Sequence, residues 1–250
     1  VKVVKISPAE SPKKVVLPNT AETDLGIVTV GAKVKFKLPV INDNNYQVKT
    51  DADWLIRKKG LFGGEKYIVN TKNLEYSTTY AARINIFGSN FQSASVVTFR
   101  TDIDPNKKVF YLSEMTPFSA KQDWGNLNKN KSVDGNPLTI GGEVFEKGLG
   151  THANSEIIYD LTRYQAKTFS SFVGQDQETN GTIQFEIYLN FGEGFISEPV
   201  FKSGILTSRD KPVKVELDIT GAEKIKLIAT DGGDNINGDH ADWGDAKIVR

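Results

Sequence analysis

The chain of 250 residues contains no cysteine and only two histidines. The absence of cysteine excludes disulfides, thiolate zinc sites and a cysteine nucleophile. No apolar run approaches the roughly 20 residues that would span a bilayer, so we expect no membrane insertion. Basic and acidic residues number 31 each, and this balance argues against nucleic acid as a partner. Partners should therefore be neutral or bound locally.

A starting methionine is also missing, because the chain begins at Val1. Such a start is typical of a chain whose leader has been removed or trimmed. We therefore expect a secreted, periplasmic or cell-surface protein whose signal is not visible in this chain.

Sustained helical periodicity is absent up to about Thr101, and apolar and polar residues alternate instead. This pattern predicts an immunoglobulin-like sandwich over residues 1–103, with Trp54 as a core residue. The charged, proline-containing stretch 101–108 predicts a linker. The expected strands of the first domain are 26–30, 34–40, 46–50, 54–57, 66–70, 81–87 and 95–100.

The second domain, residues 108–250, again predicts an all-β fold. Val213, Val215, Leu217 and Ile219 share one face of a strand whose other face is charged, as in a sheet with one solvated side. A jelly roll or related β-sandwich accommodates the number of strands. The expected strands are 143–145, 157–161, 168–173, 182–189, 213–219, 224–229 and 246–249.

Both histidines lie in polar segments bracketed by glycine. His152 belongs to the stretch 148–155, and His240 belongs to the stretch 231–243, which also holds four aspartates and a tryptophan. Such a density of hydrogen-bonding groups exceeds what a connection between strands needs. We interpret the second segment as a binding loop and the first as a turn of the same polar character.

These residue types suit carbohydrate. Sugars offer apolar C–H faces that stack on aromatic rings, and hydroxyls that bond carboxylates, amides and imidazoles. Trp124 or Trp243 would be the stacking platform, although core packing is at least as good an interpretation of Trp243. The polar candidates are His152, Asn154, Asp239, His240 and Asp242.

The aspartate-rich segment could also hold a metal ion. Asp231, Asp234, Asn235 and Asn237, together with Asp239, offer closely spaced oxygen ligands of the kind that Ca²⁺ prefers. The spacing does not match an EF-hand, and the alternative is a solvated turn whose side chains bond their own backbone. Zinc bound by the two histidines would need carboxylates to complete its coordination.

Catalysis is the weaker class of function. A glycosidase needs two carboxylates across a cleft, and Asp176, Glu178, Asp239 and Asp242 are the candidates, but nothing in the sequence pairs any two of them. A serine triad is not indicated either, because the chain lacks a Gly-x-Ser-x-Gly motif.

An ordered series of motifs from about Phe110 to Arg250 resembles the NPCBM family of carbohydrate-binding modules, which are attached to bacterial glycoside hydrolases. The matching segments are Tyr111-Leu112-Ser113, Trp124-Gly125, Ser132-Val133-Asp134-Gly135-Asn136-Pro137-Leu138, Gly141-Gly142 with Phe145, Lys147-Gly148-Leu149-Gly150-Thr151-His152-Ala153, Ser155-Glu156-Ile157, Tyr159-Asp160-Leu161, Phe172-Val173-Gly174 and Asp239-His240-Ala241-Asp242-Trp243. The sequence departs from the family pattern at Gln175 and over 190–194.

The resemblance implies a galactose-binding-like β-sandwich, frequently calcium-bearing, that binds terminal galactose or related sugars without cleaving them. Residues 1–101 resemble immunoglobulin-type or BACON-type accessory modules, on the stretch Asp51-Ala52-Asp53-Trp54-Leu55. We therefore predict a non-catalytic glycan-binding protein, with a glycoside hydrolase as a possible partner. The alternatives are a calcium-stabilised structural or protein-interaction module and a glycoside hydrolase in its own right.

Overall fold

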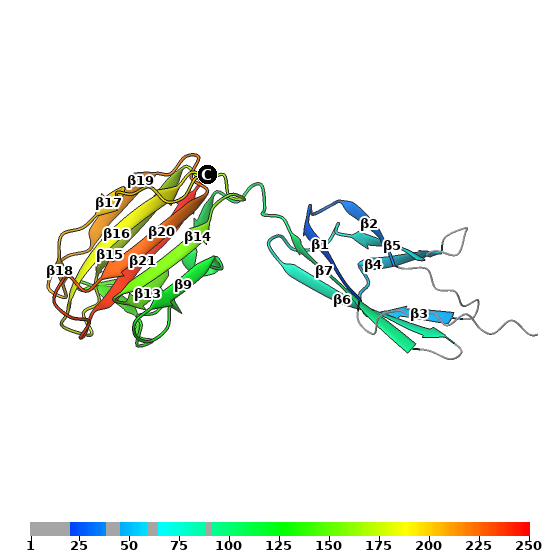
Figure 1. Ribbon diagram of the computed structural model, residues 1–250, viewed down its shortest axis with the longest axis horizontal. Helices are drawn as coiled ribbons and strands as arrows, with labels where there is room; N and C mark the ends of the chain where they lie inside the picture. Colours follow the sequence, from blue (N-terminus) through cyan, green and yellow to red (C-terminus); the bar gives the residue numbers. More distant parts are fainter. Residues whose placement is uncertain (1–20, 39–45, 60–64, 89–91) are drawn as a thin grey trace, which may run out of the picture. The chain divides into compact units, whose positions relative to one another are not determined.

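A computed structural model describes residues 21–38, 46–59, 65–88 and 92–250. The chain divides into two compact units, one ending at Asp104 and the other comprising Pro105–Arg250. Within the described ranges the regular structure is β-strand apart from one short 3₁₀ helix, η1 (Leu112–Glu114), which confirms the all-β prediction (Figure 1). Residues 1–20 of the predicted first domain, and the end of the strand expected at 34–40, lie outside the described residues.

None of the helical structure in these ranges is long and apolar enough to cross a membrane.

Two sheets form the first unit. One has the strand order β1-β7-β6-β3 and the other β2-β5-β4, with β1 parallel to β7. Named in order from A to G, these strands give the B-E-D and G-F-C sheets of an immunoglobulin-like sandwich, with the first strand added beside the last. The bounds are β1 (Ala21–Val28), β2 (Lys33–Lys37), β3 (Tyr46–Thr50), β4 (Leu55–Lys59), β5 (Glu65–Asn70), β6 (Thr79–Gly88) and β7 (Gln92–Thr101).

The core of this unit lies between its two sheets. Alternate residues of β5, β6 and β7 are buried, as expected where one face of a strand is covered. Trp54 packs edge-on against Phe99 at a centroid distance of 5.1 Å, so its predicted core role is confirmed. Tyr80 is the second residue of β6, and its hydroxyl accepts a 2.9 Å hydrogen bond from the backbone N–H of Glu75, which resembles the tyrosine corner of immunoglobulin-like domains.

The second unit is also a sandwich. One sheet has the order β10-β13-β21-β15-β19, with β8 paired to β21, and the other has the order β17-β16-β20-β14-β9, with β18 paired to β16. The bounds are β8 (Val109–Tyr111), β9 (Ser119–Gln122), β10 (Asn128–Lys129), β11 (Leu138–Ile140), β12 (Glu143–Phe145), β13 (Gly148–His152), β14 (Ser155–Asp160), β15 (Thr168–Gln175), β16 (Thr182–Asn190), β17 (Phe201–Lys202), β18 (Leu206–Thr207), β19 (Val213–Asp218), β20 (Lys224–Thr230) and β21 (His240–Val249).

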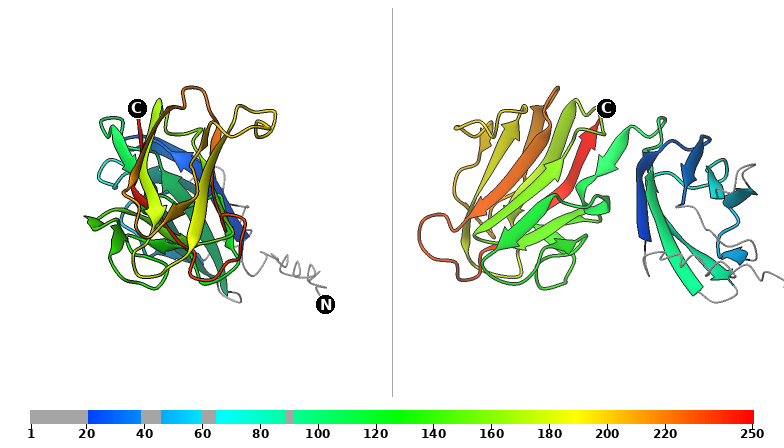
Figure 2. Two further views of the ribbon diagram at one scale, coloured as in Figure 1. Left: turned by 90° about the vertical axis from the view of Figure 1, so that its left-hand side faces the viewer. Right: turned by 45° about the vertical axis from the view of Figure 1, so that its right-hand side comes forward.

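Strand β21, red in Figure 2, lies between β13 and β15 in the first of these sheets. Its Trp243 faces the second sheet and meets Phe185 of β16 edge-on, with ring centroids 4.9 Å apart. The small hairpin of β11 and β12 lies against β21 on the opposite face, where a Cβ on Gly244 would approach the ring of Phe145 to 2.6 Å. The middle of this sheet is therefore covered on both sides.

Candidate functional site

The two histidines are neighbours across a pair of strands. His152 ends β13 and His240 begins β21, and the two residues are directly opposite each other in the antiparallel register. The centroids of their imidazole rings are 5.4 Å apart. The sequence placed both residues in loops, and this was wrong in detail: each lies at the end of a strand that meets a loop. Sheet pairing therefore brings the two imidazoles together on one face.

Trp124 completes an aromatic group with these two rings. It follows β9, and its indole lies 5.9 Å from the ring of His240, nearly parallel, and 5.2 Å from the ring of His152. Gln122 holds the turn in place, because it donates to the Trp124 carbonyl at 2.6 Å and accepts from the Thr151 hydroxyl at 2.7 Å. Half of the Trp124 surface, 51%, remains exposed. The structure thus joins three of the predicted binding residues.

A shallow pocket of about 220 Å³ lies beside this aromatic group. Trp124, His152 and His240 line it together with Ile236, Asn237 and Gly238 of the following loop. These three residues lie in the loop between β20 and β21. Ile236 and Gly238 were not predicted as binding residues, and Asn237 was predicted only as a metal ligand. The volume lies below the ~300–1,000 Å³ of pockets for drug-sized ligands and suits a small group such as one sugar residue.

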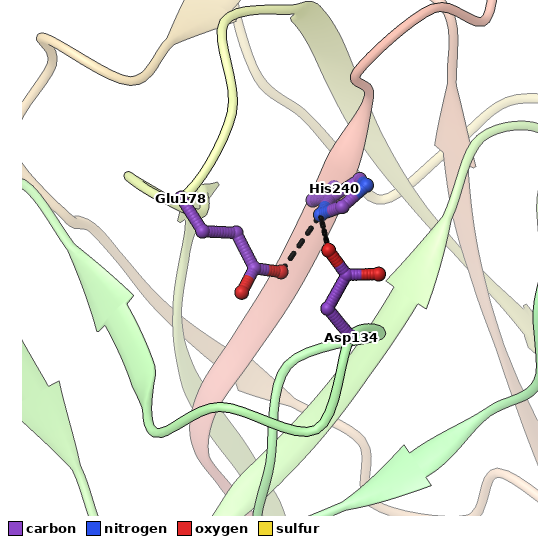
Figure 3. A group of neighbouring side chains, drawn as sticks. All are labelled: Asp134, Glu178 and His240. Atoms are coloured by element: carbon purple, nitrogen blue, oxygen red, sulfur yellow. Dashed lines mark hydrogen bonds and ion pairs between the residues drawn. The ribbon is translucent and has the colours of Figure 1, made fainter.

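Glu178 fixes the ring of His240. Its Oε1 lies 2.7 Å from His240 Nδ1, while Asp134 Oδ2 lies 3.9 Å from the same nitrogen, as drawn in Figure 3. Ser132 Oγ and Asn136 Nδ2 both donate to the other oxygen of Glu178. Burial raises the pKa of Glu178, but the hydrogen bonds from Asn136, His240 and Ser132 outweigh it and lower the pKa. Glu178 is therefore an ionised acceptor.

The same contacts determine which nitrogen of each histidine carries a proton. His240 Nδ1–H donates to the Glu178 carboxylate, and His152 Nδ1 lies 2.6 Å from the carbonyl oxygen of Ala153, which can only accept. In the neutral rings, Nε2 of both residues is consequently a hydrogen-bond acceptor. The Nε2 atom of His240 lies on the side of the ring away from the two carboxylates (Figure 3).

One group of side chains could hold a metal ion. Across the described part of the chain, Asp134, Glu178 and His240 form the one group of three or more acidic or histidine ligands whose atoms lie within 4.8 Å of one another. A cation would have to displace the proton that His240 Nδ1 donates to Glu178, and His152 is not a member of the group. The predicted zinc alternative through both histidines therefore has no support.

Some predicted binding residues are in the interior. Trp243 and Asp242 are 0% exposed, so neither can touch a ligand directly, and their assignment as contact residues was wrong. Alternation along β21 turns Trp243 toward the core and Asp242 toward the β11 hairpin. Burial, followed by the neighbouring carboxyl of Asp176, raises the pKa of Asp242 well above its usual range. Asp242 is thus enclosed in the sheet, and Asp176, 1% exposed, is also inaccessible to substrate.

Asp239 and Asn154 have structural contacts rather than pocket contacts. Asp239 is 0% exposed, and its Oδ1 accepts a 3.0 Å bond from the backbone N–H of Thr182. Its Oδ2 is buried and has no hydrogen-bond partner among the described residues. Asn154 is exposed, donates to Asp123 and accepts from the backbone N–H of Asp231, so it connects two loops beside the pocket.

The loop before β21 is organised by its own side chains. Asp231 Oδ1 accepts from the backbone N–H of Gly233, Asp234 Oδ1 from that of Asn235, and Asn235 Oδ1 from that of Asn237. The first and third of these are the bonds expected of Asx turns. Three of the four residues predicted as metal ligands therefore have an oxygen committed to shaping the loop.

The second unit resembles known proteins in sequence and in fold. Residues 108–249 match the family model described as the NPCBM/NEW2 domain. The structure of CBM51 from Clostridium perfringens GH95, in complex with methyl-galactose, is 41% identical with a TM-score of 0.52, and the similarity covers 56% of this chain and 99% of that one.

Two other relatives belong to longer proteins. The structure of the M60 catalytic domain with the CBM51-1 and CBM51-2 domains from Clostridium perfringens ZmpB is 29% identical, with a TM-score of 0.51, over 71% of this chain and 19% of that one. A Renibacterium salmoninarum protein that carries the name of an endo-alpha-N-acetylgalactosaminidase is 26% identical over 185 residues, which are 70% of this chain. The chain spans only 12% of that protein's length.

Proposed function

Because the chain belongs to the NPCBM/NEW2 domain family through residues 108–249, we propose that its second unit is a non-catalytic module that binds a terminal galactose-like sugar. The pocket lined by Trp124, His152 and His240 is the binding site. The observation that carries this proposal is the meeting of one half-exposed indole with two imidazoles whose Nδ1 atoms are already bonded.

Trp124 supplies the apolar surface. A sugar lies with its C–H face on an aromatic ring, and a half-exposed indole at the edge of a pocket offers such a ring without further rearrangement. The contacts from Gln122 and the near-parallel ring of His240 hold the indole in place, so little conformational freedom is lost on binding.

His152 and His240 supply direction. Their Nε2 atoms accept hydrogen bonds from sugar hydroxyls, because Ala153 and Glu178 hold the protons on the Nδ1 atoms. Glu178 acts through His240 as a positioning residue. Asn237 at the pocket adds an amide that can both donate and accept. Few atoms are buried in so shallow a site, and we expect modest affinity.

The carboxylates support a module that does not cleave its ligand. Asp176 and Asp242 are enclosed in the sheet, and the described structure commits Glu178 to Ser132, Asn136 and His240. A glycosidase would instead need two carboxylates that reach opposite sides of a glycosidic bond. We propose that the module serves an exported glycoside hydrolase, in line with the longer relatives in which similar modules occur.

A second proposal concerns calcium. The buried Oδ2 of Asp239, which has no hydrogen-bond partner in the described part of the chain, lies at the base of the loop that holds Asp231 and Asp234, and those two carboxylates add to the cost of ionising it. A bound cation would give this oxygen a partner and offset that cost. Calcium would then stabilise the loop that forms one wall of the sugar pocket.

The test is calorimetric titration of the full chain with methyl galactoside, repeated in a chelator, beside a glycan array. We expect His152→Ala and His240→Ala to abolish binding while leaving the chain folded, whereas Glu193→Ala, at an exposed residue after β16 that does not line the pocket, should bind normally. Retained affinity in both histidine variants would refute the site. A folded protein that binds no glycan but melts at a higher temperature in calcium would favour the structural module.

A further inference from the structure

A row of lysines covers one face of the first unit. Along β2, Lys33, Lys35 and Lys37 are exposed, whereas the alternating Phe36 is buried. The register places Lys37 opposite Lys66 of β5, and Lys66 opposite Lys58 of β4. The outward side of the sheet β2-β5-β4, labelled in Figure 1, thus carries five exposed lysines, and we call it the lysine face.

The lysine face lacks compensating charge. Among the described residues, no acidic side chain lies within 4.0 Å of the ammonium group of any of its five lysines. Lysines of the second unit do form such pairs. Like charges directly opposite each other on neighbouring strands are destabilising. An anion that bound here would relieve this repulsion. The net charge of the whole chain is zero, so the excess of positive charge is local to this face.

A hollow of about 420 Å³ lies against the same part of the sheet. Four lysines line it together with three apolar or aromatic residues: Lys35, Lys37, Lys58, Lys66, Phe36, Tyr67 and Ile68. An anionic group in this hollow would be reached by several ammonium groups at once, and the flexible lysine stems allow them to follow it. The site therefore combines a concave surface with charge of one sign.

The side chains of the lysine face select one class of polyanion. Single-stranded nucleic acid is held by stacking its bases on aromatic rings. In the described part of this sheet both aromatic residues, Phe36 and Tyr67, are buried in the sandwich and stack on each other at 5.3 Å. Peripheral membrane binding usually adds large apolar anchors, and among its described residues the face offers Ile56, 38% exposed, and the half-buried Ile68.

We propose that the lysine face binds an anionic polysaccharide through its sulfate or carboxylate groups. This site is separate from the sugar pocket, lies in the other unit of the chain, and does not depend on the proposed galactose binding. Recognition is electrostatic and tolerant of the sugar identity, because point charges on flexible stems read charge rather than shape.

The experiment measures binding of the full chain to dextran sulfate, with neutral dextran of the same length as the matched ligand. At about 0.1 M salt the Debye length is about 10 Å, so neighbouring lysines act together. We expect the unmodified chain to bind dextran sulfate and not neutral dextran. In the triple variant Lys37→Gln/Lys58→Gln/Lys66→Gln, the affinity for dextran sulfate should fall by roughly tenfold or more. The charge-matched control Lys49→Gln/Lys72→Gln/Arg83→Gln should keep the affinity of the unmodified chain.

Further readouts keep the result decisive. The triple variant should melt no lower than the unmodified chain, since it loses a repulsion, and should bind methyl galactoside unchanged. If the unmodified chain binds dextran sulfate but not methyl galactoside, the sugar pocket is refuted and this proposal stands. Equal affinity of both triple variants for dextran sulfate, failure of the unmodified chain to bind it, or tighter binding to a single-stranded oligonucleotide or to phosphatidylserine vesicles would overturn the proposal.

Discussion

Two tryptophans of the same predicted site should respond oppositely to removal. Trp124 is 51% exposed in the pocket and Trp243 is 0% exposed between the sheets. We expect Trp124→Ala to lose binding and keep stability, and Trp243→Ala to lose stability. The comparison tests the division between a ligand platform and a core residue among the tryptophans of the family motifs.

The magnitude for Trp243 follows from its packing against Phe185. Truncating a buried tryptophan costs about 3–5 kcal/mol through lost contacts and the cavity that remains. The indole N–H of Trp243 is buried without a hydrogen-bond partner among the described residues, and removing it returns about 1–3 kcal/mol. The net loss should be about 2 kcal/mol, which lowers the melting temperature of this unit by roughly 4–8 °C.

For Trp124 the cost falls on the ligand. A sugar face that covers about 80 Å² of the indole contributes about 2 kcal/mol at 25 cal/mol per Å². Its loss weakens binding by roughly 30-fold. A half-exposed residue outside the core should change stability by no more than about 0.5 kcal/mol.

The assays are thermal melting and calorimetric titration with methyl galactoside, on both variants and the unmodified chain. Phe118→Ala is the matched control, because Phe118 is an aromatic residue 64% exposed and does not line the pocket. Normal galactoside binding by Trp124→Ala, or a melting temperature lowered equally in both tryptophan variants, would refute this assignment.

Three further predictions concern residues around the pocket. Glu178→Gln removes the charge from the bond that orients the nearly buried His240, so titration should show binding weakened roughly tenfold; unchanged affinity would contradict the positioning role. Burial, then the carboxylates of Asp234 and Asp231, raises the pKa of Asp239 from 3.8 to about 6, so its folded form holds a proton more tightly and loses stability as pH rises from about 4 to about 6. The measurement is the difference in melting temperature between the unmodified chain and Asp239→Asn in chelator, which should fall over this pH range and then level off. A difference that stays constant with pH would argue against a buried ionising carboxyl. Calcium should raise the melting temperature of the unmodified chain only. Gly150→Ala would place a Cβ 2.3 Å from the Lys131 carbonyl oxygen and should cost about 1–3 kcal/mol in unfolding experiments, with weaker sugar binding because the displaced loop carries the donors to Glu178; a melt like that of the unmodified chain would show that the loop can move away.

The sequence by itself determined the fold class and most of the strands. Alternation of apolar and polar residues located each described strand of the first unit, because a half-buried strand must alternate, although β1 begins at Ala21 rather than at Gly26. The motifs around Trp124, His152 and His240 identified the family and three residues of the pocket. These features are local, and local composition records them.

The tertiary structure alone decided which polar residues face the pocket. Asp242 and Trp243 adjoin His240 in sequence, yet alternation along β21 and the cover of the β11 hairpin bury both. Glu178 lies 62 residues from His240, and no spacing rule connects them, because the contact arises from the course of the chain after β15. The lysine face is of the same kind: three strands contribute to it, and only their register brings Lys37, Lys66 and Lys58 side by side.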